Sequence, residues 1–136
     1  MKKLIFVANI ALINSDNKVL LLKRSKNLRK PDFWGFPGGL VDNGENYEVA
    51  VKRELFEETA IEECNITIND QQTFLAHGTD EDIEITLFKA KLLAPVNIKI
   101  DEYEHSEFGW FDLETISEIE NIMSDIPMMI QKLLAK

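Results

Sequence analysis

The segment from Gly38 to Ile61 constrains the fold of this chain more than any other, because it joins a glycine pair, a polar turn and an amphipathic helix. Residues 42–44, Asp-Asn-Gly, are typical of a turn. Asn46 stands where a helix N-cap is expected, and we predict a helix over residues 47–60. Apolar residues recur along it at spacings of three and four, so one face packs against a core. That face consists of Tyr47, Ala50, Val51 and Leu55.

The same helix carries one cation and three carboxylates close together, namely Arg53, Glu54, Glu57 and Glu58. Residues three and four apart on a helix are neighbours, so Glu54 faces both other glutamates and is repelled by them. Arg53 relieves only part of this repulsion. Carboxylate oxygens are ligands that Mg²⁺ and Mn²⁺ favour, so a bound cation would turn the repulsion into a binding site. The alternative is a solvated acidic helix face without a ligand.

Apolar segments on both sides of this helix predict a β-sheet. Residues 3–13 and 18–24 are rich in apolar residues, and the polar turn between them indicates a hairpin. Both segments are apolar on both faces, as expected of strands in a sheet that is covered on each side. Further strands are predicted at about 36–41, 71–77, 83–93 and 107–111.

Two more helices are predicted near the C-terminus. Asp112 is expected to cap a short helix over residues 113–119. Ser124 or Asp125 is expected to begin a final helix, with Pro127 tolerated in its first turn. Strands before and after a central helix, followed by a C-terminal helix, indicate an α+β fold in which a mixed sheet lies between helices.

Length and charge restrict the function. The 136 residues fit one domain, spanning residues 1–136. The formal net charge of −9 opposes nucleic acid binding, which relies on Lys and Arg, so we expect no nucleic acid partner. A polyanionic small molecule would need an intervening cation. The single cysteine, Cys64, excludes an intrachain disulfide and agrees with a reducing compartment, so a cytoplasmic location is expected.

The N-terminus begins like a signal peptide, with two lysines before an apolar run. Asn9 interrupts that run, and no clean cleavage site of small residues follows, so a first strand is the preferred interpretation. No apolar run approaches the ~20 residues of a membrane-spanning helix, and no membrane association is expected. We expect a monomer or a homodimer.

The central segment resembles a known motif, the Nudix box. The matching residues are Gly39, Glu45, Arg53, Glu54, Leu55, Phe56, Glu57, Glu58 and Ile61. The preceding residues 34–38, Trp-Gly-Phe-Pro-Gly, and the later residues 107–111, Glu-Phe-Gly-Trp-Phe, also resemble the family. The resemblance covers most of the chain, although only the box is highly specific. It implies a Nudix-type α/β/α sandwich and hydrolysis of a nucleoside diphosphate linked to another group, with Mg²⁺ or Mn²⁺.

The resemblance also implies roles for individual residues. Glu54, Glu57 and Glu58 would hold the metals, with the carbonyl of Gly39 as a further ligand. Arg53 would orient Glu54 or Glu57 through a charge-assisted hydrogen bond, and Glu45 would brace the loop or the arginine.

The general base is not settled by the motif. Glu54 stands where family members often have it, whereas other members use a glutamate from a later loop. The later candidates in this chain are Glu104, Glu102 and Glu107, in that order.

Four residues are candidates for substrate binding, namely Trp34, Phe36, Gly38 and Arg24. Trp34 could stack on a nucleobase, with packing under the box as the alternative. Arg24 belongs to the basic segment 23–30, which either contacts phosphate or is a solvated loop.

One position departs from the family, since Ala60 replaces the usual glycine at the end of the catalytic helix. We expect either a penalty at Ala60 or a helix that continues for part of a turn. The segment most resembles the MutT-like members, which act on nucleoside triphosphates. The alternatives are a nucleotide-sensing module without turnover and a pyrophosphatase of ADP-ribose or nucleotide sugars.

Overall fold

The computed structural model describes residues 2–134, which form a seven-stranded mixed sheet. Its strands are β1 (Lys3–Ile13), β2 (Lys18–Arg24), β3 (Trp34–Gly35), β4 (Gly38–Leu40), β5 (Ile66–His77), β6 (Glu81–Leu92) and β7 (His105–Asp112). The order is β3-β2-β1-β6-β5, with β4 also paired to β1 and β7 to β2. The central pair β1 and β6 is parallel, and the other pairs are antiparallel.

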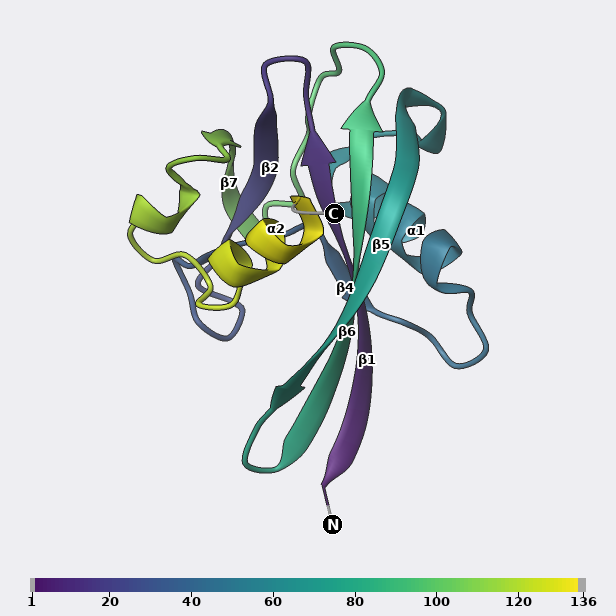
Figure 1. The fold of residues 1–136 in the computed structure, drawn as a ribbon, viewed down its shortest axis with the longest axis vertical. Coiled ribbons are helices and arrows are strands. Elements are labelled where there is room, and N and C mark those ends of the chain that lie inside the picture. Colours follow the sequence, from purple (N-terminus) through teal and green to yellow (C-terminus); the bar gives the residue numbers. More distant parts are fainter. Residues whose placement is uncertain (1, 135–136) are drawn as a thin grey trace.

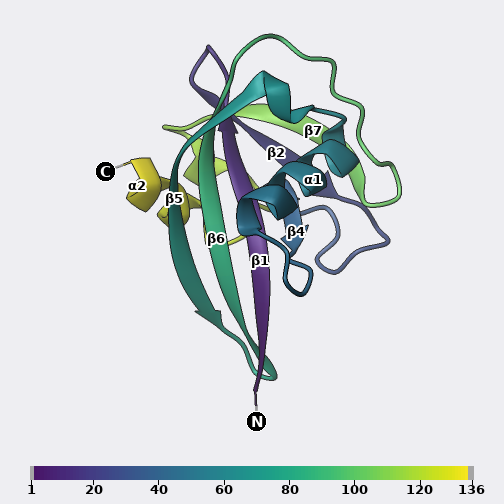
Figure 2. The ribbon, with the colours of Figure 1, turned by 90° about the vertical axis from the view of Figure 1, so that its right-hand side faces the viewer.

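Helices cover both faces of the sheet, as predicted (Figures 1 and 2). α1 (Tyr47–Thr59) lies on one face and α2 (Ile126–Leu134) on the other, with short 3₁₀ turns at η1 (Glu63–Asn65) and η2 (Ile116–Glu118). The α+β sandwich expected from the sequence is therefore confirmed.

The two faces of β1 and β2 supply two separate cores. Ile10, Leu12, Leu20 and Leu22 are fully buried in the core beneath α1. Ala11, Val19 and Leu21 point the other way, into the core beneath α2. This alternation is why both strands are apolar throughout, and it confirms that the sheet is covered on each side.

One local prediction near the C-terminal helix is wrong. The helix expected over residues 113–119 is only the 3₁₀ turn Ile116–Glu118, although Asp112 Oδ1 accepts a hydrogen bond from the Glu114 N–H at 2.9 Å, as a helix cap does. The final helix α2 begins at Ile126, and the carbonyl of Asp125 accepts from the Met129 N–H at 3.0 Å, so Asp125 stands at its start as expected.

The strand expected at residues 36–41 is present as β4, and an additional two-residue strand, β3, precedes it in a segment expected to be loop. Pro37 has no N–H for a sheet ladder, and the chain changes partner there. β3 pairs with β2 before this point, whereas β4 pairs with β1 after it. This change of partner brings the glycine pair against β1 and beneath α1.

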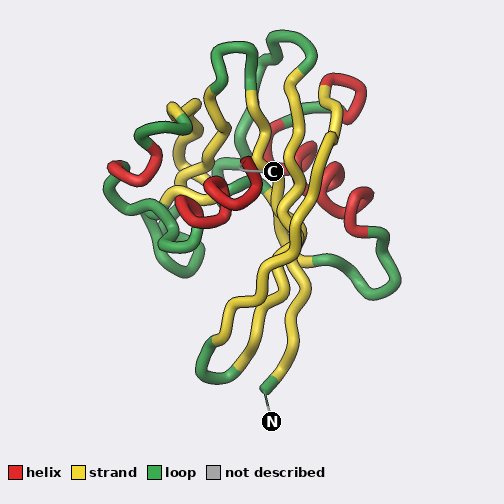
Figure 3. The backbone as a smooth tube through the Cα atoms, in the orientation of Figure 1, coloured by secondary structure: helices red, strands yellow, loops and turns green. Residues whose placement is uncertain are grey.

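The lower ends of β1, β5 and β6 extend beyond the helices as a three-stranded arm (Figure 3). β5 is longer than predicted and starts at Ile66. Ile5 and Val7 of β1 pair with Ile83 and Ile85 of β6, so their side chains share one face of the arm. That apolar face forms one wall of the cleft described below.

Candidate active site

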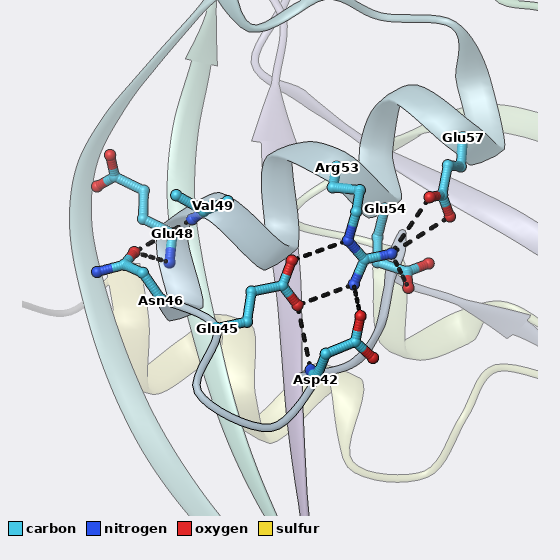
Figure 4. A network of polar contacts seen from close by, with 8 residues as sticks. All are labelled: Asp42, Glu45, Asn46, Glu48, Val49, Arg53, Glu54 and Glu57. Carbon is cyan, nitrogen blue, oxygen red and sulfur yellow. Dashed lines mark hydrogen bonds and ion pairs between the residues drawn. The ribbon is translucent and has the colours of Figure 1, made fainter.

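Asn46 starts the helix that carries the charged residues. Its side-chain oxygen accepts hydrogen bonds from the N–H groups of Glu48 at 2.8 Å and Val49 at 3.2 Å, which confirms the predicted N-cap (Figure 4). Such a cap satisfies backbone donors that have no partner within the helix. The register of α1 is thereby set about two turns before Arg53.

Arg53 connects the loop before α1 to two glutamates of the helix (Figure 4). Its Nε and one terminal nitrogen donate to both oxygens of Glu45, at 2.9 and 3.0 Å. The other terminal nitrogen donates to Glu54 at 3.0 Å and to Glu57 at 3.2 Å. The paired hydrogen bond to Glu45 holds the guanidinium plane, and these bonds raise the pKa of Arg53 above its usual range. The contacts expected of Arg53 and Glu45 are thus present.

Glu58 is the buried carboxyl of the cluster, only 4% exposed. Its Oε1 accepts a hydrogen bond from the Gly38 N–H at 2.8 Å. Burial raises the pKa of Glu58 to about 9, and the nearby carboxylates of Glu54, Glu104 and Glu57 contribute to the rise. Burial also raises the pKa of Glu54, although Arg53 opposes that shift.

Both glycines of the pair are required by close contacts. Gly38 has a φ of +146°, and an added Cβ would lie 2.2 Å from the carbonyl oxygen of Ala8. An added Cβ at Gly39 would lie 2.7 Å from the carboxyl carbon of Glu54. The backbone of β4 therefore touches the carboxylates of α1 only because these side chains are absent.

These residues fit a divalent cation by their chemistry. Glu54 and Glu58 offer hard oxygen ligands in a part-buried setting, where burial raises the pKa of both carboxyls and a bound cation would favour their charged forms. Among residues 2–134 no three acidic, histidine or cysteine side chains converge as a ready metal cluster. Glu57 is held by Arg53 and is half exposed, so it would have to turn to join the site.

Ala60 ends the helix in the left-handed conformation, with φ 64° and ψ 15°. Its N–H donates to the carbonyl of Phe56 at 2.8 Å. Of the two outcomes expected for the missing glycine, the structure shows the strained helix end. In the last turn, the carbonyl of the buried Thr59 accepts from the N–H of Lys99, in the connection after β6, at 2.9 Å.

The carboxylates open into a cleft of about 870 Å³. Seven of the predicted site residues line it: Arg24, Phe36, Gly38, Gly39, Glu54, Glu58 and Glu104. Glu102 and Glu107 do not line it. Among the three later glutamates, only Glu104, the first choice from the sequence, lies at the cleft. Burial raises the pKa of Glu104, with Asp101 and Glu57 adding to the effect.

Trp34 lies outside the lining of the cleft. Its ring packs edge-on against Phe111 at 4.9 Å between centroids, and Lys23 Nζ lies 5.9 Å from the ring. These contacts favour the packing alternative for Trp34 over a stacking contact with a base.

His105 and Arg29 also line the cleft, although neither was chosen as a site residue from the sequence; Arg29 belongs to the basic segment 23–30. His105 is 5% exposed, and its Nε2 lies 4.0 Å from Glu58 Oε2. Burial, together with Arg24, lowers the pKa of His105 to about 4. Neither residue lies in a local motif. For His105, the only signal in the sequence was that it directly follows Glu104.

No helix within residues 2–134 has the length and apolar character needed to cross a membrane.

The comparisons with known proteins agree with this geometry. Residues 3–132 match the family model described as the NUDIX domain. An RNA pyrophosphohydrolase of Pelagibacter ubique is 31% identical, over 81% of this chain and 77% of that protein. An 8-oxo-dGTP diphosphatase of Proteus vulgaris is 32% identical, over 64% of this chain and 76% of that protein. The crystal structure of a MutT protein from Methanosarcina mazei superposes with a TM-score of 0.84 at 27% identity, over 96% of this chain and 93% of the other. The chain therefore belongs to the Nudix family, as a MutT-like hydrolase of phosphoanhydride bonds.

Proposed function

We propose that this Nudix hydrolase cleaves a pyrophosphate bond of a free nucleoside triphosphate with the help of Mg²⁺ or Mn²⁺. The observation that supports this most is that Glu54, Glu58 and Glu104 line the same cleft as the glycine pair and Arg24. Such a cleft offers cation ligands on one wall and a fixed positive charge near them. A polyphosphate bridges those two features.

The residues of the chain divide the chemistry between them. Glu54 and Glu58, with Glu57 after rotation and the Gly39 carbonyl, would hold the cation. When bound, the cation neutralises phosphate charge and lowers the pKa of water. Glu104 or Glu54 then accepts a proton from the attacking water, and the bond to the leaving phosphate group breaks.

Other residues orient the reacting groups. The guanidinium of Arg24 is half-buried at the cleft, where it can donate to a phosphate oxygen. The Gly38 N–H holds one oxygen of Glu58, and Arg53 holds Glu54. The apolar wall formed by Ile5, Val7 and the paired strand β6 offers a surface for a base.

A free nucleotide fits the charge of this protein better than an RNA end does. The net charge of −9 repels a polynucleotide that extends beyond the cleft. Asp42, Glu81 and Asp125 also lie along the cleft itself. The relatives named for RNA and for 8-oxo-dGTP make both substrate types worth testing directly. A 5′-triphosphorylated RNA is therefore the second candidate.

The test is phosphate or pyrophosphate release from a nucleotide panel with Mg²⁺ or Mn²⁺. The panel includes ordinary and oxidised nucleoside triphosphates, ADP-ribose, nucleotide sugars and a short 5′-triphosphorylated RNA. We expect turnover of at least one free triphosphate, lost on chelation of the metal. Binding of a nucleotide without turnover of any member would support the sensing module and refute the enzyme.

The assigned residues are tested by Glu54→Gln and Glu58→Gln, each expected to lower kcat by about 100-fold or more while the protein stays folded. Glu48→Gln is the matched control, since Glu48 lies on the exposed first turn of the same helix. Full activity in both cleft variants would show that the metal residues are wrongly assigned.

A further inference from the structure

Glu104 reaches the cleft from a segment without regular secondary structure. It is the last residue of the connection 93–104 between β6 and β7. A carboxylate that moves a proton must be held in a productive position, because misplacement by about 1 Å can cost 100-fold in rate. The hydrogen bonds around Glu104 show what holds it.

One set of hydrogen bonds ties Glu104 to the end of α1. The Asp101 N–H donates to the carbonyl of Glu58 at 3.3 Å. The carbonyl of Asp101 in turn accepts from the N–H groups of Glu104 at 3.1 Å and His105 at 2.9 Å. The turn that ends in Glu104 is therefore attached to the helix that carries the box glutamates.

A second set comes from Ser25, which directly follows β2 and is only 6% exposed. Its hydroxyl donates to the carbonyl of Tyr103, and its N–H donates to the carbonyl of Glu104 at 2.9 Å. These two carbonyls belong to the peptide groups on either side of the Glu104 Cα. Ser25 thus holds the backbone before and after the side chain in question.

Asn27 reinforces this clamp. Its side-chain amide donates to the carbonyl of Tyr103 at 3.0 Å, and its N–H donates to the Ser25 hydroxyl oxygen at 3.2 Å. Two donors therefore converge on one carbonyl, and the serine oxygen is held by its own neighbour. These bonds hold the turn in addition to those that attach it to α1.

The sheet itself turns toward the cleft at this point. Lys23 pairs with Glu107, but Arg24 pairs with His105, so Ser106 is an extra residue in β7. A bulge of this kind bends a strand and redirects the neighbouring side chains. Glu104 and His105 accordingly line the cleft, whereas Ser106 is exposed.

We propose that Ser25 is a positioning residue for Glu104 in the hydrolysis reaction, with Asn27 in support. This inference rests on the proposed function and on Glu104 as the group that accepts the proton. Ser25 does not line the cleft, and its hydroxyl and N–H donate to the carbonyls of Tyr103 and Glu104, so its effect passes through the backbone of Glu104. A change at Ser25 therefore alters the catalytic step more than binding.

Ser25→Ala tests this with the nucleoside triphosphate that the panel identifies. We expect kcat to fall about 10- to 100-fold, with KM and the dissociation constant for Mn²⁺ changed less than threefold. Asn27 is exposed, so Asn27→Ala should leave the fold intact and lower kcat in the same way but by a smaller factor. Ser106→Ala removes an exposed hydroxyl from the adjacent bulge and should leave kcat unchanged. An unchanged kcat in both Ser25→Ala and Asn27→Ala would overturn the proposal.

A double-substitution cycle separates positioning from general support of the fold. In a Glu104→Gln background, Ser25→Ala should change kcat less than threefold, because the group it positions is already gone. A full loss in that background would assign Ser25 a structural role and overturn the proposal. No turnover by the unsubstituted protein would overturn the proposed function as well, whereas an active protein indifferent to Ser25→Ala overturns this inference alone.

Discussion

Replacement of Ala60 by glycine should stabilise this protein, although it adds no contact. Ala60 has φ 64°, a conformation that costs a residue with a Cβ about 1–2 kcal/mol. Glycine removes that cost, but it also increases the entropy of the unfolded chain, which lowers the free energy of unfolding by about 0.4–1 kcal/mol. The net expectation is a free energy of unfolding larger by about 1 kcal/mol.

The expected change in melting temperature follows from the length of the chain. An unfolding entropy of about 2.1 cal/mol/K per residue, applied to 136 residues, converts 1 kcal/mol into a rise of about 3–4 °C. Thermal unfolding followed by circular dichroism measures such a shift. Turnover should change little, because the Ala60 side chain is exposed and does not line the cleft.

Ala94→Gly is the matched control. Ala94 is also an exposed alanine, but its φ is not positive, so glycine relieves no strain there. The same substitution should therefore lower the free energy of unfolding by about 0.4–1 kcal/mol. Equal destabilisation by Ala60→Gly and Ala94→Gly would refute the argument that Ala60 is strained.

Two further predictions concern the carboxylates. Gly39→Ala should lower kcat about 100-fold with the fold retained, because the new Cβ would lie 2.7 Å from the Glu54 carboxyl carbon and displace that side chain. Metal-dependent turnover measures the fall in kcat, and circular dichroism shows whether the fold is retained. Full activity of Gly39→Ala would contradict this contact. In EDTA, the free energy of unfolding should decline as pH rises from about 5 to 9. Glu58 has a pKa of about 9 in the fold and 4.5 in the unfolded chain, so the folded protein binds one more proton over this pH range and becomes less stable as that proton is lost. Urea unfolding of the unsubstituted protein and of Glu58→Gln at several pH values measures this, and the decline should be weaker in Glu58→Gln; parallel profiles would rule out Glu58 as its source.

Much of the fold was predictable because its signals are local. Residues 3–13 and 18–24 are apolar on both faces, which indicates strands covered on each side, and Asn46 indicates the start of α1. The change of strand partner at Pro37 was not predictable in this way, since it depends on where β1 and β2 separate in space. The helix expected over residues 113–119 is only the 3₁₀ turn Ile116–Glu118, although the Asp112 side chain makes the same kind of cap bond as Asn46.

The choice of Glu104 shows a limit of sequence reasoning. Glu102, Glu104 and Glu107 lie within six residues and carry the same chemistry. Only Glu104 lines the cleft, because hydrogen bonds from Ser25 and to α1 fix its backbone and a bulge bends the strand that follows. These contacts join residues 43 to 79 positions apart, which no spacing rule describes.

The sequence by itself determined that Glu54, Glu57 and Glu58 share one helix beside Arg53, since helical spacing is a local property. Tertiary structure alone decided their environments. Glu58 docks against the Gly38 N–H and is almost fully buried, whereas the adjacent Glu57 is half exposed and held by Arg53. The physical reason is the packing of α1 on β1 and β4, because burial of one carboxyl and solvation of its neighbour depend on which side of the helix meets the sheet.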